Sequence, residues 1–369
     1  MKTENTNIFF YTNDNTQQSK RQLIPLMTSL EQEGFNIFCN NPWGEKVLGN
    51  IIGMPLEKYL EEHSLVKTFF FVFNAFEVKK ISKQLKNKKN CIIIYRPRGI
   101  LPEESFYRRG SYIRKKALDY IETKAMKLAD YYCFITYSQR LHFASKYYNI
   151  KNVFSRSIVV HNYLLCEDKK TEFEYEKNKE KNDKLKLVYS GGFSKWQKID
   201  DVFKLVKDIY LKYKSIEFNI YTFEKNNEKA NELIEKYQLQ EIAKISNLKM
   251  DEVDYHMRYN DVGIILRDDS LVNITASPFK IADYLGANVG LIMTDNIGDY
   301  KEVLKDKPYV YFANTNTKGE ICYNSDEIVK FLKYIKEQDI KKVISKDVEV
   351  FFNMKEEIKK LKKFINEIS

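Results

Sequence analysis

The stretch that decides the fold is DVGIILRDDSLVNITASPFKIADYLGANVGLIMTDNIGD, residues 261–299. It contains an apolar run at 261–266, a polar loop, a helical pattern at 278–285 and a second apolar run at 289–294. This order predicts the strand, helix and strand of a parallel sheet. Ligands of such sheets bind beyond the carboxyl ends of the strands. We therefore expect Arg267, which follows the first strand, to face a ligand.

The helix in this stretch should begin at a site suited to phosphate. Ser277 is a good N-cap and Pro278 a good first helical residue. The unpaired N–H groups of a helix start attract anions. Lys280 lies in the first turn, and Asp283 follows on the same face, so a cation for phosphate and a carboxylate for a sugar diol are close together. The alternative is a surface pair of Lys280 with Asp283 and a solvated Arg267.

Similar alternation runs along the whole chain. A length of 369 residues favours two domains. Further strands are predicted at 7–12, 35–39, 67–73, 91–96, 131–136, 157–161, 185–190 and 217–222. Residues 166–184 are charged and poor in apolar side chains, so we place a linker there. The predicted organisation is an N-terminal domain at 1–165, a C-terminal domain at 185–350 and a C-terminal helix at 351–369 that packs back on the first domain.

Several helices have a clear apolar periodicity. Helices are predicted at 111–130, 200–213, 227–237, 325–336 and 355–368. The apolar residues of the first are Ile113, Ala117, Tyr120, Ile121, Met126 and Leu128. The last helix, 355–368, should pack on a domain, with a membrane-binding strip as the alternative. The lysine-rich segment 79–89 is expected to be a solvated helix face, again with membrane docking as the alternative.

Composition excludes several function classes. No apolar run reaches the roughly 20 residues of a membrane-spanning helix, and the first residues lack the pattern of a secretion signal, so we expect a cytoplasmic protein. The five cysteines and four histidines are scattered, and no Asp-x-Asp triplet occurs, so we expect no protein-bound metal. The net charge of +10 would attract any polyanion, but no nucleic-acid recognition motif is present.

A second candidate segment is YSGGFSKWQKIDD, residues 189–201. Its strand ends at Gly191 and Gly192, where missing side chains let the backbone approach a ligand. A bare glycine pair can equally be a simple turn. Trp196 could stack on a base or sugar, or pack in a core.

A third segment, YRPRGILPEESFYRRG at 95–110, follows a strand of the first domain. Arg96 and Arg98, with Glu103 and Glu104, could orient an anionic or hydroxyl-bearing acceptor. The alternative is an arginine and glutamate network that shapes the loop.

The segment 277–287 resembles the donor-binding region of glycosyltransferase family 4, where Ser-Pro-x-Lys-x-x-acid-Tyr-Leu-Ala-x-Gly is common. Here the pattern stands as Ser277, Pro278, Lys280, Asp283, Tyr284 and Leu285, followed by Gly286 and Ala287. The resemblance implies that Lys280 contacts the diphosphate and Asp283 the ribose. It also implies a glycine-rich donor turn at Gly191 and Gly192 with Lys198 following, and it matches the arginine and glycine run after 95. Many members carry an additional glutamate where Thr275 stands here.

The resemblance implies a GT-B fold, two Rossmann-like doubly wound domains facing a central cleft. It further implies a retaining glycosyltransferase that needs no metal or other cofactor. The donor is then a nucleotide sugar and the acceptor a glycan or lipid-linked glycan of a surface polysaccharide such as capsule or O-antigen, with peripheral membrane association. Lys280 and Arg267 would stabilise the leaving diphosphate. Three alternatives remain: a nucleotide-sugar epimerase of the same fold, a non-catalytic GT-B partner subunit and a basic nucleic-acid-binding protein.

Overall fold

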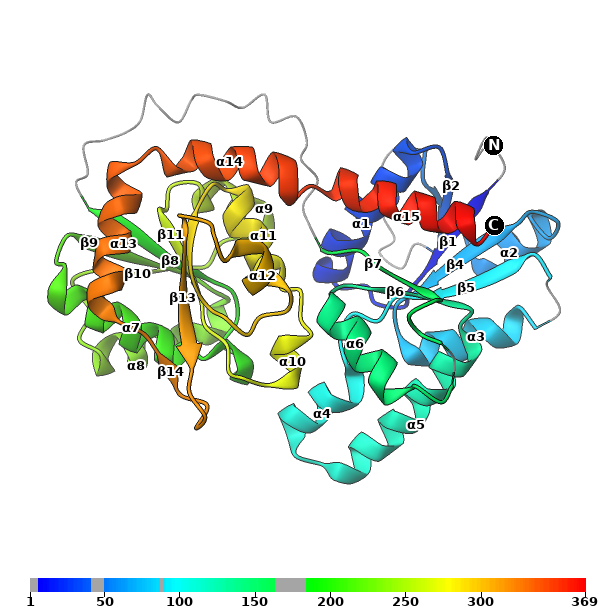
Figure 1. Cartoon of the computed structure of the whole chain (residues 1–369), viewed down its shortest axis with the longest axis horizontal. Coiled ribbons are helices and arrows are strands. Elements are labelled where there is room, and N and C mark those ends of the chain that lie inside the picture. Colours follow the sequence, from blue (N-terminus) through cyan, green and yellow to red (C-terminus); the bar gives the residue numbers. More distant parts are fainter. Residues whose placement is uncertain (1–5, 41–49, 87–88, 151, 163–183) are drawn as a thin grey trace. The chain divides into compact units, whose positions relative to one another are not determined.

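The computed structural model describes residues 6–40, 50–86, 89–150, 152–162 and 184–369. The predicted linker at 166–184 lies outside this part of the chain except for its last residue. The chain forms two compact units (Figure 1). The first comprises Met1–Leu165, Thr275–Ser277 and Met354–Ser369, and the second comprises Cys166–Ile274 and Pro278–Asn353.

The first unit is built on a parallel sheet with strand order β3-β2-β1-β4-β5-β6-β7. Its strands are β1 (Asn7–Tyr11), β2 (Asn36–Cys39), β3 (Ile52–Gly53), β4 (Thr68–Val72), β5 (Cys91–Tyr95), β6 (Tyr131–Phe134) and β7 (Ser157–Val159). Its helices are α1 (Gln17–Gln32), α2 (Leu56–Glu62), α3 (Ala75–Gln84), α4 (Leu101–Arg109), α5 (Tyr112–Leu128), α6 (Tyr137–Lys146) and α15 (Met354–Glu367).

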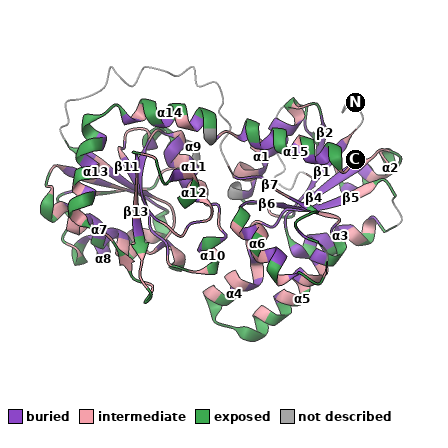
Figure 2. Ribbon diagram, in the orientation of Figure 1, coloured by how far each residue is buried: buried purple, intermediate pink, exposed green. Residues whose placement is uncertain are grey.

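The central strands of this sheet are buried on both faces, as Figure 2 shows. This is why they are continuous apolar runs, NIFFY and TFFFV, without polar alternation. Phe10 and Phe71 face a core that also contains the apolar side of α15, including Leu361. Phe9 and Phe70 point the other way and contact the ring of Tyr59 on α2.

The second unit repeats this plan with strand order β10-β9-β8-β11-β12-β13-β14, in which only the last pair is antiparallel among the strands described. Its strands are β8 (Leu185–Ser190), β9 (Ile216–Tyr221), β10 (Ala243–Ser246), β11 (Val262–Ile265), β12 (Gly290–Thr294), β13 (Val310–Thr315) and β14 (Ile321–Cys322). Its α-helices are α7 (Ile199–Lys212), α8 (Asn227–Lys236), α9 (Met250–Met257), α10 (Leu271–Ile274), α11 (Phe279–Gly286), α12 (Tyr300–Leu304), α13 (Ser325–Glu337) and α14 (Ile340–Phe351).

The strand order of the second unit fixes where a ligand can bind. From β8 the sheet grows in one direction through β9 and β10, and in the other direction through β11, β12 and β13, so the strand order reverses between the neighbours β8 and β11. In open α/β sheets, ligands bind outside the carboxyl ends of the strands at such a switch point. Gly191 directly follows β8, and Arg267 follows β11 after one residue.

The prediction for the apolar face of α5 needs correction, and several elements were not predicted. Helix α5 exists, but Ile113 and Tyr120, predicted on its apolar face, are 85% and 60% exposed. Its buried residues include the predicted Met126, but the others are Leu118, Glu122 and Ala125. The strands β3, β10, β13 and β14 were not predicted, because they are short or partly exposed. The helices α9, α10, α12 and α14 of the second unit were not predicted either. The predicted fold class, two Rossmann-like α/β sheets, is confirmed.

Candidate functional site

The turn after β8 has a backbone that only glycine adopts easily. Gly191 has φ +126°, its N–H donates to Tyr221 O (2.8 Å), and its carbonyl accepts from Thr222 Oγ1 (2.9 Å). The carbonyl of Gly192 accepts a bond from the hydroxyl of Tyr189 (2.7 Å). The turn is therefore held by side chains on both sides.

Helix α11 begins one residue later than predicted. Pro278, with extended backbone angles, is the N-cap, and Phe279 is the first helical residue. Ser277 lies one residue before this N-cap. It is buried, and its carbonyl accepts from Asn162 Nδ2 (3.3 Å) within the first unit. Lys280 still lies in the first turn, where N–H groups have no partner inside the helix.

Lys280 is directed at the turn after β8. Its ammonium donates to Gln197 Oε1 (2.8 Å) and Tyr189 Oη (3.2 Å), and it lies 4.3 Å from the centroid of the Tyr189 ring. A Cβ on Gly191 would lie 2.8 Å from this ammonium nitrogen. The glycine therefore provides the space that Lys280 occupies.

Arg267 is the second cation of the site. The residue is buried. Its backbone N–H donates to Thr294 Oγ1 (3.1 Å) on β12, and its guanidinium Nη1 donates to Trp196 O (3.5 Å). Burial lowers the pKa of Lys280 well below its ordinary value, and the nearby Arg267 guanidinium lowers it further, whereas Asp283 raises it. Two cations so placed repel each other in the ligand-free protein, and a bound anion would relieve that repulsion.

Asp283 and Lys198 flank this centre. Asp283 lies one turn after Lys280 on α11 and is partly exposed. Lys198 has a left-handed backbone (φ 46°) at the start of α7 and pairs with Asp201 (3.4 Å). The structure thus brings together Gly191, Lys280 and Arg267, while the ammonium of Lys198 is held by its own helix.

Tyr284 anchors α11 to the sheet. Its hydroxyl accepts from Ser190 N (3.0 Å) and approaches Ile264 O at 3.4 Å. Its ring lies against Gly263, where an added Cβ would come within 2.7 Å of the ring. Gly263 is therefore needed for close packing of the helix that carries Lys280.

Sequence reasoning did not single out Tyr189 and Gln197, although both contact Lys280 and both lie in the quoted segment 189–201. Their positions, next to the glycine pair and next to Lys198, were the available signal. Their contact with Lys280 could not be predicted from the sequence, because that lysine lies more than 80 residues later in the chain.

In the first unit, Arg96 and Arg98 follow β5 but diverge. Arg96 is buried and donates to Cys133 Sγ, Val160 O and Asn162 Oδ1, each at 3.0 Å. Arg98 pairs with Asp14, donates to Ser19 Oγ (2.7 Å) and lies over the ring of Phe73. Asp14 follows β1, Ser19 lies on α1 and Phe73 follows β4. Arg98 therefore lies at the carboxyl ends of β1 and β4, the neighbouring strands at which the strand order of this sheet reverses.

Glu103 belongs to a different cluster of the first unit. It accepts from Lys146 (2.8 Å) and pairs with Lys115 (3.4 Å). The neighbouring Glu104 accepts from Ile100 N (3.2 Å) and fills the space beside Gly99. In this structure Glu103 and Glu104 thus bond to lysines and to the backbone of their own unit.

Within the described residues, no group of three or more His, Cys, Asp or Glu side chains is placed to hold a metal ion. Among the helices in the same ranges, none combines the length and hydrophobicity required to span a bilayer.

The strand orders of both units define an α/β protein with two Rossmann-like domains, and comparison with solved structures identifies this as the GT-B fold. HepE from Anabaena, solved with UDP and glucose, matches with a TM-score of 0.68 and 10% identity over 98% of this chain and 99% of that chain. The lipopolysaccharide outer core galactosyltransferase WaaB matches with a TM-score of 0.64 and 11% identity over 99% and 100% of the two chains.

Sucrose-phosphate synthase from Thermosynechococcus elongatus matches equally well, with a TM-score of 0.64 and 10% identity over 99% of this chain and 100% of that chain. No family model matches the sequence, and a search of curated proteins gives no significant match. At these identities the structural similarity shows the fold.

Proposed function

We propose that the protein is a glycosyltransferase that moves a sugar from a nucleoside-diphosphate sugar to a glycan or lipid-linked acceptor. The observation that carries the proposal is the placement of Lys280, at the start of α11, against the Gly191 turn and near Arg267. This is where a GT-B protein with such a switch point would bind the donor diphosphate.

The chemistry requires stabilisation of the diphosphate as it leaves. Lys280, Arg267 and the N–H groups at the start of α11 supply positive charge at one place. We propose that this charge suffices without a metal ion. Asp283 would hold the ribose hydroxyls, and Lys198 would reach the diphosphate by leaving Asp201. Retention of anomeric configuration is proposed from the resemblance to family 4.

The donor and acceptor classes rest on analogy. HepE was solved with UDP and glucose, which supports a uridine nucleotide as the first donor to test. WaaB is a lipopolysaccharide galactosyltransferase, which supports an acceptor of surface-glycan type. A lipid-linked acceptor would place the protein at the cytoplasmic face of a membrane.

The test is binding followed by product analysis. The purified chain is titrated calorimetrically with a panel of nucleotide sugars, and the best ligand is incubated with oligosaccharide and lipid-linked acceptors, with and without EDTA. Release of nucleoside diphosphate together with a glycosylated product, unchanged by EDTA, is expected, and NMR of the new linkage gives its anomeric configuration. An altered nucleotide sugar formed without an acceptor would instead identify an epimerase, and no binding of any nucleotide sugar would identify a non-catalytic partner.

A further inference from the structure

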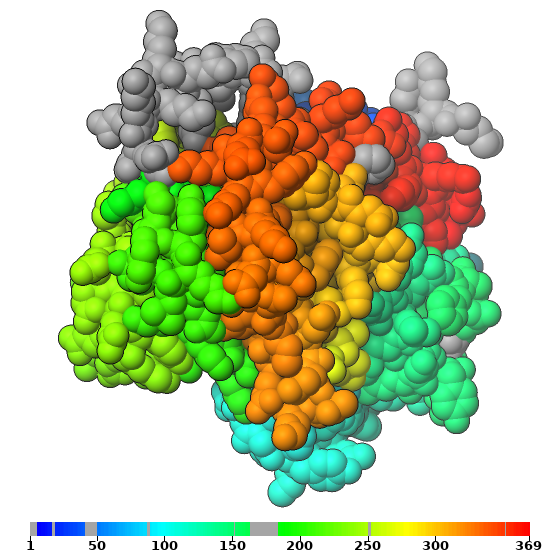
Figure 3. Space-filling model, turned by 60° about the vertical axis from the view of Figure 1, so that its left-hand side comes forward, coloured from blue at the N-terminus to red at the C-terminus, as the bar shows by residue number. Residues whose placement is uncertain are grey.

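The first unit carries an exposed hairpin whose apolar side chains its own fold does not cover. Helix α4 ends at Gly110, which has φ +66° and no atom within 4 Å of where a Cβ would lie, and α5 starts after Ser111, whose side chain accepts from Arg114 N. The turn between the helices is therefore only two residues long. Figure 2 shows exposed residues on both sides of it, and the segment, cyan, is on the surface in Figure 3.

The exposed side chains at this hairpin are large and apolar or aromatic. Phe106, Tyr112, Ile113 and Tyr120 are all more than 40% exposed, and Ile113 is 85% exposed. Single exposed apolar residues are common, but four on one short helical hairpin are more than scattered surface residues and favour a binding surface.

The exposed charges around these side chains are mainly positive. Residues 105–124 contain six cations, Arg108, Arg109, Arg114, Lys115, Lys116 and Lys124, and two acidic residues, Asp119 and Glu122. Glu122 is fully buried, and Asp119 pairs with Lys115 (3.0 Å) and Lys146 (2.8 Å), so the exposed cations are Arg108, Arg109, Arg114 and Lys116. On α5, Tyr112, Lys116, Tyr120 and Lys124 are spaced by four residues and so form one stripe. Lys116 lies over the ring of Tyr112 (5.2 Å) and Lys124 over that of Tyr120 (4.3 Å).

We propose that this α4–α5 tip, residues 105–124, docks on an anionic lipid surface. Aromatic rings and an exposed isoleucine suit the boundary between headgroups and acyl chains, and the surrounding cations suit lipid phosphates. A nucleic acid would use the cations but leave Ile113 without a role. The proposal rests on the proposed function in one respect: docking on lipid would bring the protein to a lipid-linked acceptor.

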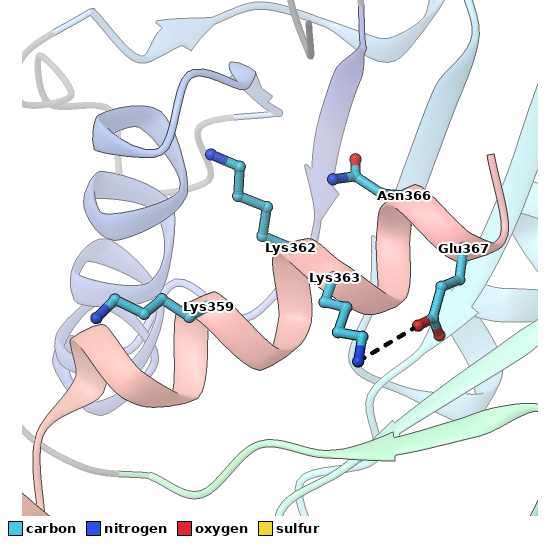
Figure 4. Close-up of a pocket in the computed structure, with 5 residues that line it drawn as sticks. All are labelled: Lys359, Lys362, Lys363, Asn366 and Glu367. Atoms are coloured by element: carbon cyan, nitrogen blue, oxygen red, sulfur yellow. Dashed lines mark ion pairs between the residues drawn. The ribbon is translucent and has the colours of Figure 1, made fainter. Parts of the chain in front are cut away.

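Helix α15 is the competing basic surface, and its charges are arranged differently. It carries five lysines but also three glutamates. Figure 4 shows the hollow beside it, lined by Lys359, Lys362, Lys363, Asn366 and Glu367. Lys359 pairs with Glu356 (2.6 Å), Lys362 with Glu33 (2.9 Å) and Lys363 with Glu367 (4.0 Å). Its apolar face is already buried in the core of the unit.

The test is co-sedimentation of the full chain with vesicles of phosphatidylcholine, alone or mixed with phosphatidylglycerol. We expect binding only to the mixed vesicles, weakening with salt. The double variant Arg108→Gln/Arg109→Gln should bind at least about fivefold more weakly. Ile113→Ser should bind about tenfold more weakly. Both should melt at the wild-type temperature, because the changed side chains are exposed.

Matched controls change the same kinds of side chain elsewhere in the unit. Leu65→Ser removes an 88% exposed leucine, and Lys359→Gln/Lys363→Gln removes two cations from α15; neither should alter vesicle binding. The proposal is overturned if the α15 pair abolishes binding, or if the wild type ignores anionic vesicles. It is also overturned if Ile113→Ser changes only self-association in sedimentation velocity, or if the arginine pair matters only for binding to an RNA duplex. Because no donor or acceptor is used, these outcomes are independent of sugar transfer.

Discussion

Lys280 occupies the space that a side chain at Gly191 would need: an added Cβ would lie 2.5 Å from its Cε and 2.8 Å from its Nζ. The same glycine has φ +126°, which side chains rarely adopt. Replacement by alanine therefore strains the turn and displaces the ammonium group at once. We expect Gly191→Ala to lower affinity for UDP by at least about tenfold, the loss of one charged contact.

Gly319→Ala is the matched control for this change. Gly319 also has a positive φ (+77°), but nothing lies within 4 Å of an added Cβ. It should lower thermal stability slightly, by about 1 kcal/mol or less, without affecting UDP binding in calorimetry. Equal losses of affinity in both variants would mean that strain alone, and not contact with Lys280, explains the effect.

Lys280 and Asp283 should each matter for turnover of the donor. Lys280→Ala and Asp283→Ala are expected to reduce it at least about tenfold, because each loses a contact to a charged or sugar group, of roughly 1.5–3 kcal/mol for a charged partner. Lys305→Ala, which removes an exposed lysine paired with Glu302, should have no effect. Steady-state kinetics with melting curves decides the matter, and wild-type turnover in both site variants would remove the two residues from the site.

The lowered pKa of Lys280 predicts a pH dependence of binding. A diphosphate binds the ammonium form, so UDP affinity should fall as pH rises through this pKa, at lower pH than for an exposed lysine. The unfolded chain has an ordinary lysine and binds more protons in the interval between the two pKa values, so stability should rise with pH there. Calorimetry and denaturant unfolding across neutral to alkaline pH should reveal both trends, and Lys280→Met should flatten them. A wild-type affinity that is independent of pH would contradict the assignment.

Tyr284→Phe tests whether the hydroxyl of Tyr284 stabilises the end of β8, which precedes the Gly191 turn. The hydroxyl of Tyr284 receives the backbone N–H of Ser190, so its removal leaves that donor without this partner. We expect a loss of about 1–3 kcal/mol in the free energy of unfolding, together with weaker UDP binding, because Ser190 precedes the Gly191 turn. Tyr255→Phe, at an exposed tyrosine of α9, should change neither quantity in denaturant titration and calorimetry. An unchanged stability in Tyr284→Phe would show that the bond is dispensable.

Much of the fold could be predicted because parallel strands buried on both faces are continuous apolar runs, as in β4 and β12. The positions of Arg267 and Lys280 followed from the same logic, since each is close in sequence to a strand end or helix start. The contact of Lys280 with Tyr189 spans 91 residues and leaves no local pattern. For α5 the helix was predicted correctly, but most of its predicted apolar face was wrong. Of the apolar residues in the pattern only Met126 is buried, and the buried face also includes Glu122.

Residues adjacent in sequence also separated in the fold. Arg98 and Glu103 were grouped as contacts for one acceptor, but a loop and a helix turn lie between them and direct them to different partners. Sequence spacing alone does not determine on which side of a loop a side chain emerges.

Glu103 lies in a polar cluster that should contribute to stability. Lys146 joins Glu103 (2.8 Å), Asp119 (2.8 Å) and the fully buried Glu122 (3.0 Å), and although burial lowers the pKa of Lys146, the carboxylates raise it overall. Removing this cation leaves Glu122 buried without its charge partner, so Lys146→Met should cost roughly 3 kcal/mol in unfolding. Lys127→Met, at an exposed lysine of α5, should cost little.

Glu103→Gln separates the structural role from the proposed contact with acceptor. If Glu103 only neutralises Lys115 and Lys146, this change lowers the unfolding free energy by about 1–3 kcal/mol and leaves the KM for acceptor unchanged. If it contacts the acceptor, stability changes little while the KM for acceptor rises. Urea unfolding and acceptor kinetics on one preparation distinguish the two, and because the carboxylate is already bonded to two lysines we expect the first result.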